Sequence, residues 1–236
     1  MALYRDEGVV LRTIRLGEAD RIVTLMTAAH GKVRAVAKGV RKTTSRFGGR
    51  LEPPSHVAVQ LWAGRELDIV TQVESIEAFR RVREDLDRLA RATMVLEAVD
   101  QVAREREADQ RLYRMLVGAL RTLCASDSPL VVPAFFWKLL AHEGFAPVVD
   151  ACASCGAPGE LVAFDLGEGG ALCRGCRRGA AVSPEAVGLI RRILGGELGR
   201  VLSGPVDPAV AAEVDVLAVR ALEHHLERRL RSAGVL

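Results

Sequence analysis

Four of the five cysteines in this 236-residue chain occur in two closely spaced pairs. Cys152 and Cys155 form the first Cys-x2-Cys pair, and Cys173 and Cys176 form the second, with seventeen residues between the pairs. A two-residue spacer lets a tight turn direct both thiols at one point, and four thiolates are a ligand set that zinc prefers. The pattern predicts one structural zinc ion. Because the protein supplies all four ligands, no coordination position stays open for water, which argues against metal-dependent catalysis.

Glycines and arginines surround these cysteines. Gly156 and Gly175 are expected to adopt positive φ in the two turns. Arg174, Arg177 and Arg178 can offset the negative charge of four thiolates around one dication, or they can contact DNA. Two redox-active pairs are the alternative to a metal site, but such pairs typically accompany a βαβ unit, which this segment does not resemble. The fifth cysteine, Cys124, falls on an apolar helix face and is predicted to fill the core.

A second set of chemically informative residues is cationic. The stretch 31–51 holds seven basic residues and no acidic residue. Side chains two positions apart on a strand share a face and lie about 6.6 Å apart, which suits the phosphates of an extended nucleic-acid strand. Guanidinium and hydroxyl groups contact phosphate, and an aromatic ring can stack on a base. The predicted DNA-binding residues are Lys32, Arg34, Lys38, Arg41, Lys42, Arg46, Phe47 and Arg50, with an ordinary solvated face as the alternative. Trp62 is another aromatic candidate, although packing within its strand is the favoured interpretation.

The elements that position these residues change in character along the chain. Short alternating or β-branched runs joined by glycine-containing turns predict five strands, which a small closed barrel would bury without open edges. Apolar residues then recur every three or four positions, which indicates helices. The strands are expected at 8–14, 21–27, 32–40, 57–62 and 67–73, and the helices at about 82–103, 112–124, 133–142, from 184 and at 209–232.

These patterns predict an α+β chain of several domains. A nucleic-acid-binding barrel is expected at 1–79, followed by an all-helical domain at 80–147 and 182–236, with the four-cysteine zinc module inserted at 148–181. The formal net charge is only +3, but residues 1–80 hold 13 Lys/Arg against 9 Asp/Glu. The positive excess therefore lies in the predicted barrel.

Other features of the sequence limit the functions that the chain can have. No apolar run approaches the ~20 residues of a membrane span, and the first eight residues lack a signal-peptide core, so a cytoplasmic protein without a membrane partner is expected. Some adenylate kinases and protein deacylases carry two similar cysteine pairs, but they need a phosphate-binding or dinucleotide-binding loop that this sequence lacks. We therefore expect no enzyme activity and no small-molecule substrate.

Several strings together resemble the RecO family of bacterial recombination mediators over essentially the whole chain. The first is Glu-Gly-Val-Val-Leu at 7–11, and the second is Gly-Glu-Ala-Asp-Arg-Ile-Val-Thr-Leu at 17–25. The others are at 31–32, 37–41, 45–47, 51–53 and 144–147, together with the four cysteines.

The resemblance implies an N-terminal five-stranded OB-fold and a helical domain that carries the zinc module. It also implies binding of single- and double-stranded DNA, annealing of complementary strands, and work with RecR and single-strand-binding protein to load RecA, at the bacterial nucleoid. Lys32, Arg34 and Lys38 would lie on strand 3 of the usual OB-fold ligand surface, whereas 41–50 would lie off its centre. A zinc-containing interaction module outside recombination, such as a transcription accessory, is the alternative, and strand annealing discriminates between the two.

Overall fold

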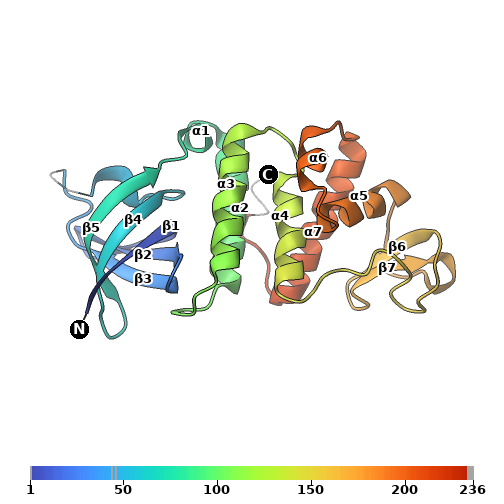
Figure 1. Ribbon diagram of the computed structural model, residues 1–236, viewed down its shortest axis with the longest axis horizontal. Helices are drawn as coiled ribbons and strands as arrows, with labels where there is room; N and C mark the ends of the chain where they lie inside the picture. Colours follow the sequence, from blue (N-terminus) through green and yellow to red (C-terminus); the bar gives the residue numbers. More distant parts are fainter. Residues whose placement is uncertain (1, 44, 46, 233–236) are drawn as a thin grey trace. The chain divides into compact units, whose positions relative to one another are not determined.

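The computed structural model describes residues 2–43, 45 and 47–232 (Figure 1). The chain divides into two compact units, the first reaching Ala125 and the second beginning at Ser126. Each unit is described by itself below. No helix among the described residues is both long and apolar enough to cross a membrane.

The first unit begins with a closed five-stranded barrel of order β1-β2-β3-β5-β4, as predicted. Its only parallel pair among the described strands is β3 with β5; the other four pairs are antiparallel. A register shift between Val10 and Arg12 interrupts the β1–β2 ladder, and β1 pairs with both β2 and β4. Such a bulge bends a strand, so one long strand serves two sides of the barrel. The strands are β1 Leu3–Leu16, β2 Asp20–Thr27, β3 Gly31–Ala37, β4 His56–Trp62 and β5 Asp68–Glu77.

Alternation along the strands separates the core from the outer surface. On β3, Val33, Ala35 and Ala37 are buried in the barrel, whereas Lys32 and Arg34 face outward, as the sequence predicted. The connection from β3 to β4 contains a short 3₁₀ helix, η1 (Gly48–Leu51), which covers one part of the barrel core.

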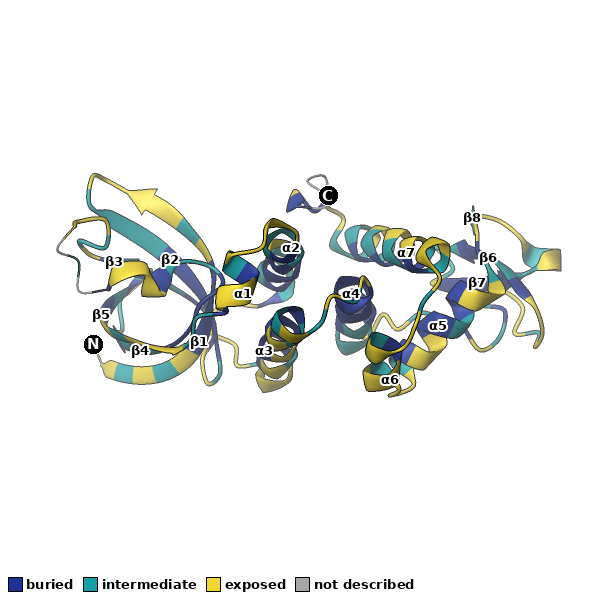
Figure 2. Cartoon of the chain, turned by 90° about the horizontal axis from the view of Figure 1, so that it is seen from above, coloured by how far each residue is buried: buried dark blue, intermediate teal, exposed yellow. Residues whose placement is uncertain are grey.

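Three helices complete the first unit: α1 (Arg80–Arg83), α2 (Leu86–Val102) and α3 (Gln110–Ala125). The single helix predicted near 82–103 is interrupted because the Asp85 side chain accepts a hydrogen bond from the Arg88 backbone N–H and so begins a new helix there. In α3 the buried residues lie along one side and the exposed residues along the other, whereas most residues of α2 are buried or half-buried (Figure 2). The pattern of α3 is the amphipathic pattern expected of a helix that packs on a core.

The segment 103–109, here called the strap, joins α2 to α3 and pairs with the barrel. The Lys32 N–H donates to Arg104 O at 3.2 Å, and the Arg106 N–H donates to Lys32 O at 3.0 Å. Gly31 is required at this contact, because a Cβ there would lie 1.8 Å from Glu107 O. The strap therefore acts as a short extra strand beside β3.

The second unit combines four helices with a small sheet of order β7-β6-β8. Two helices begin where predicted: Ser183 accepts from the Ala186 N–H, and Asp207 accepts from the Ala209 N–H. The last helix ends at Leu226 rather than near residue 232, because Glu227 has a left-handed backbone with φ of 50°. The elements are α4 Val131–His142, β6 Leu161–Asp165, β7 Gly170–Cys173, the 3₁₀ helix η2 Arg174–Cys176, β8 Ala180–Ala181, α5 Pro184–Leu194, α6 Leu198–Ser203 and α7 Pro208–Leu226.

Candidate metal centre and nucleic-acid interface

The four predicted metal ligands converge on one point. Their Sγ atoms all lie within 4.8 Å of one another, and the Sγ atoms of Cys155 and Cys173 are 3.9 Å apart. Four sulfurs at about 2.3 Å from a tetrahedral zinc ion would be about 3.8 Å from one another. Cys152 and Cys155 come from the loop before β6, whereas Cys173 ends β7 and Cys176 lies in η2. The donor set and its spacing therefore fit a zinc module.

Tight turns direct these thiols inward. Gly156 has φ of 71° and its N–H donates to Cys152 O at 2.8 Å, which closes the first turn as predicted. The expectation for Gly175 was wrong: it lies within η2, and the positive φ of 76° falls at Gly179 instead. A helical turn already brings residues three apart onto one side, so Cys173 and Cys176 need no left-handed residue between them.

The thiols differ in acidity because their surroundings differ. Backbone N–H groups of Cys173 and Cys155 stabilise the Cys152 thiolate and lower its pKa to about 6. Hydrogen bonds with the thiols of Cys155 and Cys173 raise the pKa of Cys176 to about 12. Several thiolates this close repel one another, so a bound dication is what permits all four to ionise together.

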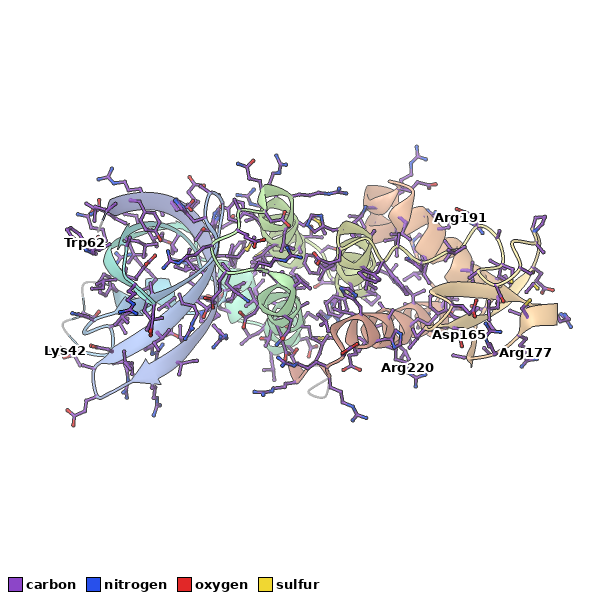
Figure 3. The ribbon with its side chains drawn as sticks, turned by 90° about the horizontal axis from the view of Figure 1, so that it is seen from below. Lys42, Trp62, Asp165, Arg177, Arg191 and Arg220 are labelled. Atoms are coloured by element: carbon purple, nitrogen blue, oxygen red, sulfur yellow. The ribbon has the colours of Figure 1, made fainter. Side chains whose placement is uncertain are left out.

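Two of the three nearby arginines are paired within the same module. Arg174 lies 3.3 Å from Glu160, and Arg178 pairs with Glu168. Arg177 is exposed and projects from the far end of the module (Figure 3). Carboxylates rather than thiolates therefore hold Arg174 and Arg178.

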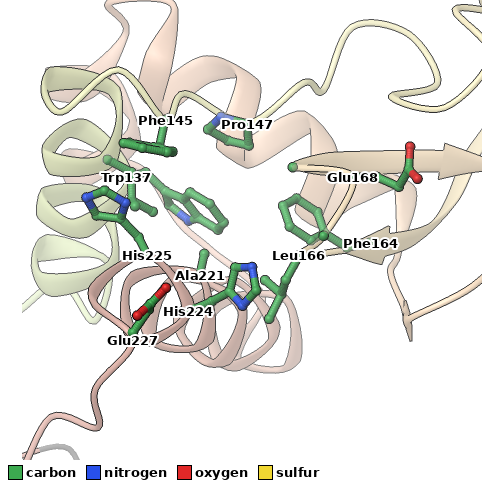
Figure 4. A pocket seen from close by; sticks show the side chains of 13 residues that line it. Trp137, Phe145, Pro147, Phe164, Leu166, Glu168, Ala221, His224, His225 and Glu227 are labelled. Atoms are coloured by element: carbon green, nitrogen blue, oxygen red, sulfur yellow. The ribbon is translucent and has the colours of Figure 1, made fainter.

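A pocket of about 480 Å³ lies between α4, α7 and the β6–β7 turn (Figure 4). Trp137, Phe145 and Phe164 contribute aromatic walls, and the Phe145 ring lies 3.9 Å from the His225 ring between centroids. Because residues 166–169 of the cysteine module form one wall, the shape of this pocket depends on the folding of that module.

The predicted basic residues fall into two groups. Lys32 donates from Nζ to Asp100 O at 2.6 Å and lies 3.7 Å from Asp100 Oδ1. Arg34 lies 3.8 Å from Glu105 in the strap. These acidic residues largely neutralise the β3 cations that sequence reasoning assigned to DNA.

The remaining described cations lie on the connection between β3 and β4. Lys38 is in the turn after β3, not on the strand, and Lys42 follows it at the barrel surface (Figure 3). Arg41 donates to Glu18 O at 2.8 Å, and Arg50 is exposed. Arg46 lies outside the described residues. The predicted cations that are exposed and described therefore lie on the connection, where Arg41 and Arg50 also donate hydrogen bonds to backbone carbonyls.

Phe47 does not present its ring to a base. It is only 3 % exposed and belongs to the barrel core with Leu51, Val10 and Leu61. The prediction of base stacking by Phe47 was therefore wrong. This residue belongs to the connection from β3 to β4, and its ring packs inside the barrel. For Trp62 the sequence favours packing within its strand, but the side chain is 41 % exposed.

Replacement of Phe47 by alanine is expected to destabilise the first unit by about 3–5 kcal/mol, because it opens a cavity in the barrel core. Urea unfolding measured by circular dichroism would give this change. Phe145→Ala removes an equal side chain that is 58 % exposed and should cost much less. Equal stability of Phe47→Ala and the unchanged chain would mean that the ring is not a core residue in solution.

Sequence patterns do not predict a buried charge cluster that the first unit contains. Asp68, on β5, is 0 % exposed and accepts hydrogen bonds from Tyr4 Oη, from Arg106 at 2.8 Å and from the Gly64 N–H at 2.9 Å. Burial alone would raise the pKa of Asp68, but these hydrogen bonds outweigh burial and lower it. Arg106 has a left-handed backbone with φ of 61°, which the strap maintains. This cluster joins the strap to β1 and β5.

A five-stranded barrel of this topology, followed by helices and a four-cysteine cluster, defines a class of OB-fold proteins with a metal-binding helical region. Comparison with known proteins specifies the class further. The family model for the recombination protein O N terminal matches residues 1–79, and that for the recombination protein O C terminal matches residues 83–233. The chain belongs to the RecO family of DNA repair proteins.

Curated relatives agree with this assignment over their full length. A protein named DNA repair protein RecO from Nocardioides sp. is 46 % identical, covering 98 % of this chain and 97 % of the relative. Proteins of the same name from Frankia casuarinae and Streptomyces coelicolor are 44 % and 43 % identical, covering 100 % and 98 % of this chain and 99 % and 98 % of the relatives.

Proposed function

We propose that this chain is a recombination mediator that binds single- and double-stranded DNA and anneals complementary strands. It works with RecR and single-strand-binding protein to assist RecA loading, and it catalyses no reaction of its own. Membership of the RecO family supports the mediator role and the partners. The observation that supports DNA binding by this chain is the set of exposed cations on the β3–β4 connection of an OB-fold barrel.

The proposed metal ion is one structural Zn²⁺ bound by Cys152, Cys155, Cys173 and Cys176. When bound, the ion would link the two cysteine-containing turns and would carry out no chemistry on a substrate. The protein brings the ligands together: the β6–β7 hairpin spans the distance between the cysteine pairs, and the Gly156 turn directs the first pair inward.

The proposed mechanism is electrostatic and independent of base sequence. Cations of the β3–β4 connection neutralise phosphates and so reduce the repulsion between two DNA backbones. Base pairing between the strands then supplies the specificity. The decisive test is annealing of two complementary oligonucleotides at two salt concentrations, with and without single-strand-binding protein. Acceleration by the chain supports the mediator role, whereas binding without acceleration indicates an interaction module outside recombination.

The double variant Arg41→Ala/Lys42→Ala is expected to weaken DNA binding evenly across base sequences. Each lost phosphate contact should reduce the slope of log K against log salt by about 0.7 for single strands, so the slope should flatten by about 1.4. Fluorescence anisotropy across a salt series measures both quantities. Arg220→Ala removes an exposed cation of α7 in the second unit and should leave the slope unchanged. An unchanged slope in the double variant would exclude these two residues from the DNA path.

A further inference from the structure

Two helices of the first unit carry arginines without any acidic residue. α1 and α3 together contain six arginines and no aspartate or glutamate. Arg83 is half-buried and donates to Glu52 O at 2.6 Å, whereas the other five arginines are exposed. These five are called the arginine ridge here: Arg80 and Arg81 of α1, and Arg111, Arg114 and Arg121 of α3.

Helix geometry places the α3 members of the ridge on one face. At about 100° per residue, Arg111, Arg114 and Arg121 fall within an arc of about 80°, and at 1.5 Å per residue they span about 15 Å along the axis. The opposite face of α3 is buried in the core of the unit. α1 packs against α3 and lies beside its C-terminal end, so its two exposed arginines extend the row (Figure 1).

Folding of the unit does not account for these arginines. Arg111 stands in the first turn of α3, where the positive end of the helix dipole disfavours a cation. Arg121 lies 2.9 Å from Glu77, whereas the other four members of the ridge pair with no carboxylate among the described residues. Like charges on one helix face also repel one another. An anionic partner would remove both penalties.

A glycine lies in the middle of the ridge. Gly118 is exposed between Arg114 and Arg121, although glycine in a helix interior is less favourable than alanine. Apart from the backbone of its own helix, a Cβ at this position would meet no atom within 4 Å, so packing inside the chain does not require glycine. A partner whose backbone approaches the helix closely would require it.

The side chains of the ridge indicate which partner fits. No aromatic side chain is exposed on α1 or α3, so nothing there can stack on unpaired bases, whereas guanidinium groups bind phosphates without reading the bases. A protein partner would also need apolar anchors, and α3 exposes no large apolar side chain. Duplex DNA carries one charge per ~1.7 Å of its axis, so a row of about 15 Å faces about nine charges.

We propose that the arginine ridge binds the phosphate backbone of duplex DNA, with Gly118 allowing that backbone to approach α3. This inference rests on the proposed DNA-binding function and assigns the paired product of annealing to a surface outside the barrel. Figure 3 shows Lys42 at the end of the first unit away from the green helices α2 and α3. The barrel and the ridge therefore hold different DNA: an unpaired strand at the first, and a duplex at the second.

A salt series of duplex binding by the full-length chain tests the proposal. In Arg111→Ala/Arg114→Ala, the slope of log K against log salt for a short duplex should flatten by about 1.8, because each phosphate contact contributes about 0.9. Duplex affinity near 0.1 M salt should fall roughly 10- to 100-fold, and oligothymidylate binding should change little. Arg200→Ala/Arg220→Ala removes two exposed cations from the second unit, so it controls for net charge and should leave the duplex slope unchanged.

A second variant separates binding from folding. Gly118→Gln places a better helix former in open space, so Tm should rise, yet its side chain should keep the DNA backbone away and lower duplex affinity about tenfold. Gly188 in α5 is also open, but the arginines three and four residues after it are paired with carboxylates. Gly188→Gln should therefore raise Tm without changing duplex affinity.

Each contrary result has a distinct meaning. If Arg111→Ala/Arg114→Ala keeps the duplex slope of the unchanged chain, the ridge proposal fails and the DNA-binding function survives. Equal losses for duplex and oligothymidylate would overturn the assignment to duplex DNA. Weaker binding of polyglutamate with unchanged duplex binding would assign the ridge to an acidic protein segment instead. If the unchanged chain binds no DNA, both the ridge proposal and the proposed function fail.

Discussion

Removal of the proposed metal ion is expected to unfold residues 148–181 while the barrel remains folded. The small sheet of the cysteine module is short, and metal binding worth about 10–16 kcal/mol in small zinc sites is largely local folding energy. Hydrogen–deuterium exchange with and without a strong chelator would detect the loss of protection in β6 and β7. A colorimetric zinc assay on released metal should give one ion per chain.

A pair of cysteine variants provides the control for metal removal. Cys152→Ser should release the metal and expose the module to exchange, whereas Cys124→Ser should retain one ion, because Cys124 lies in α3 of the first unit. DNA binding should survive in both variants. If Cys152→Ser abolished DNA binding while the helices stayed folded, the DNA site would have to be reassigned to Arg174, Arg177 and Arg178.

Replacement of Asp68 by asparagine is expected to destabilise the first unit by about 1.5–3 kcal/mol, since it removes the buried carboxylate that accepts hydrogen bonds from Tyr4 and from the half-exposed Arg106. The shape of the side chain is preserved, so the loss reports charge and hydrogen bonding rather than packing. Urea midpoints at pH 7 would measure it. Glu66→Gln, a neighbouring exposed carboxylate, should change the midpoint little. A midpoint for Asp68→Asn within error of the unchanged chain would show that the cluster contributes nothing to stability.

The contribution of Asp68 should also depend on pH. Its folded pKa is lowered, so the unfolded chain takes up the proton more readily than the folded chain. The stabilisation is therefore fully present above the unfolded pKa of about 3.9 and is lost as the pH falls through the folded value. The difference in urea midpoint between the unchanged chain and Asp68→Asn should accordingly be large at pH 7 and should shrink below pH 4. A difference independent of pH would rule out the ionised carboxylate as its cause.

Local pattern was enough to predict most of the architecture. Alternation in β3 correctly assigned Val33 and Ala35 to the interior, and the spacing of the cysteines correctly predicted one cluster. The errors lie where distant residues decide the outcome. Lys32 binds the backbone carbonyl of Asp100, which is 68 residues further along the chain, and nothing near Lys32 indicates that contact. Phe47 fills the barrel from a segment whose composition suggested a surface loop.

The apolar surface of the barrel was missed for a related reason. Ile14, Val36 and Trp62 are unremarkable alone, and each fits a strand that buries one face. Strand register connects them through Ile22 and Ile69, and the sequence does not specify the parallel pairing of β3 with β5 on which that connection depends. A tryptophan in a strand is more often covered than exposed, so sequence pattern alone favours packing for Trp62.

The strap has a consequence for where the first domain ends. A boundary near residue 79 separates the strands from the helices in the sequence, yet Arg106, a partner of buried Asp68, lies beyond that boundary, and so does the backbone that pairs with Lys32. A fragment that stops at residue 79 would carry a buried carboxylate without its guanidinium partner and a β3 edge without its cover. We therefore propose that the barrel folds together with α1, α2 and α3, which belong to the same compact unit.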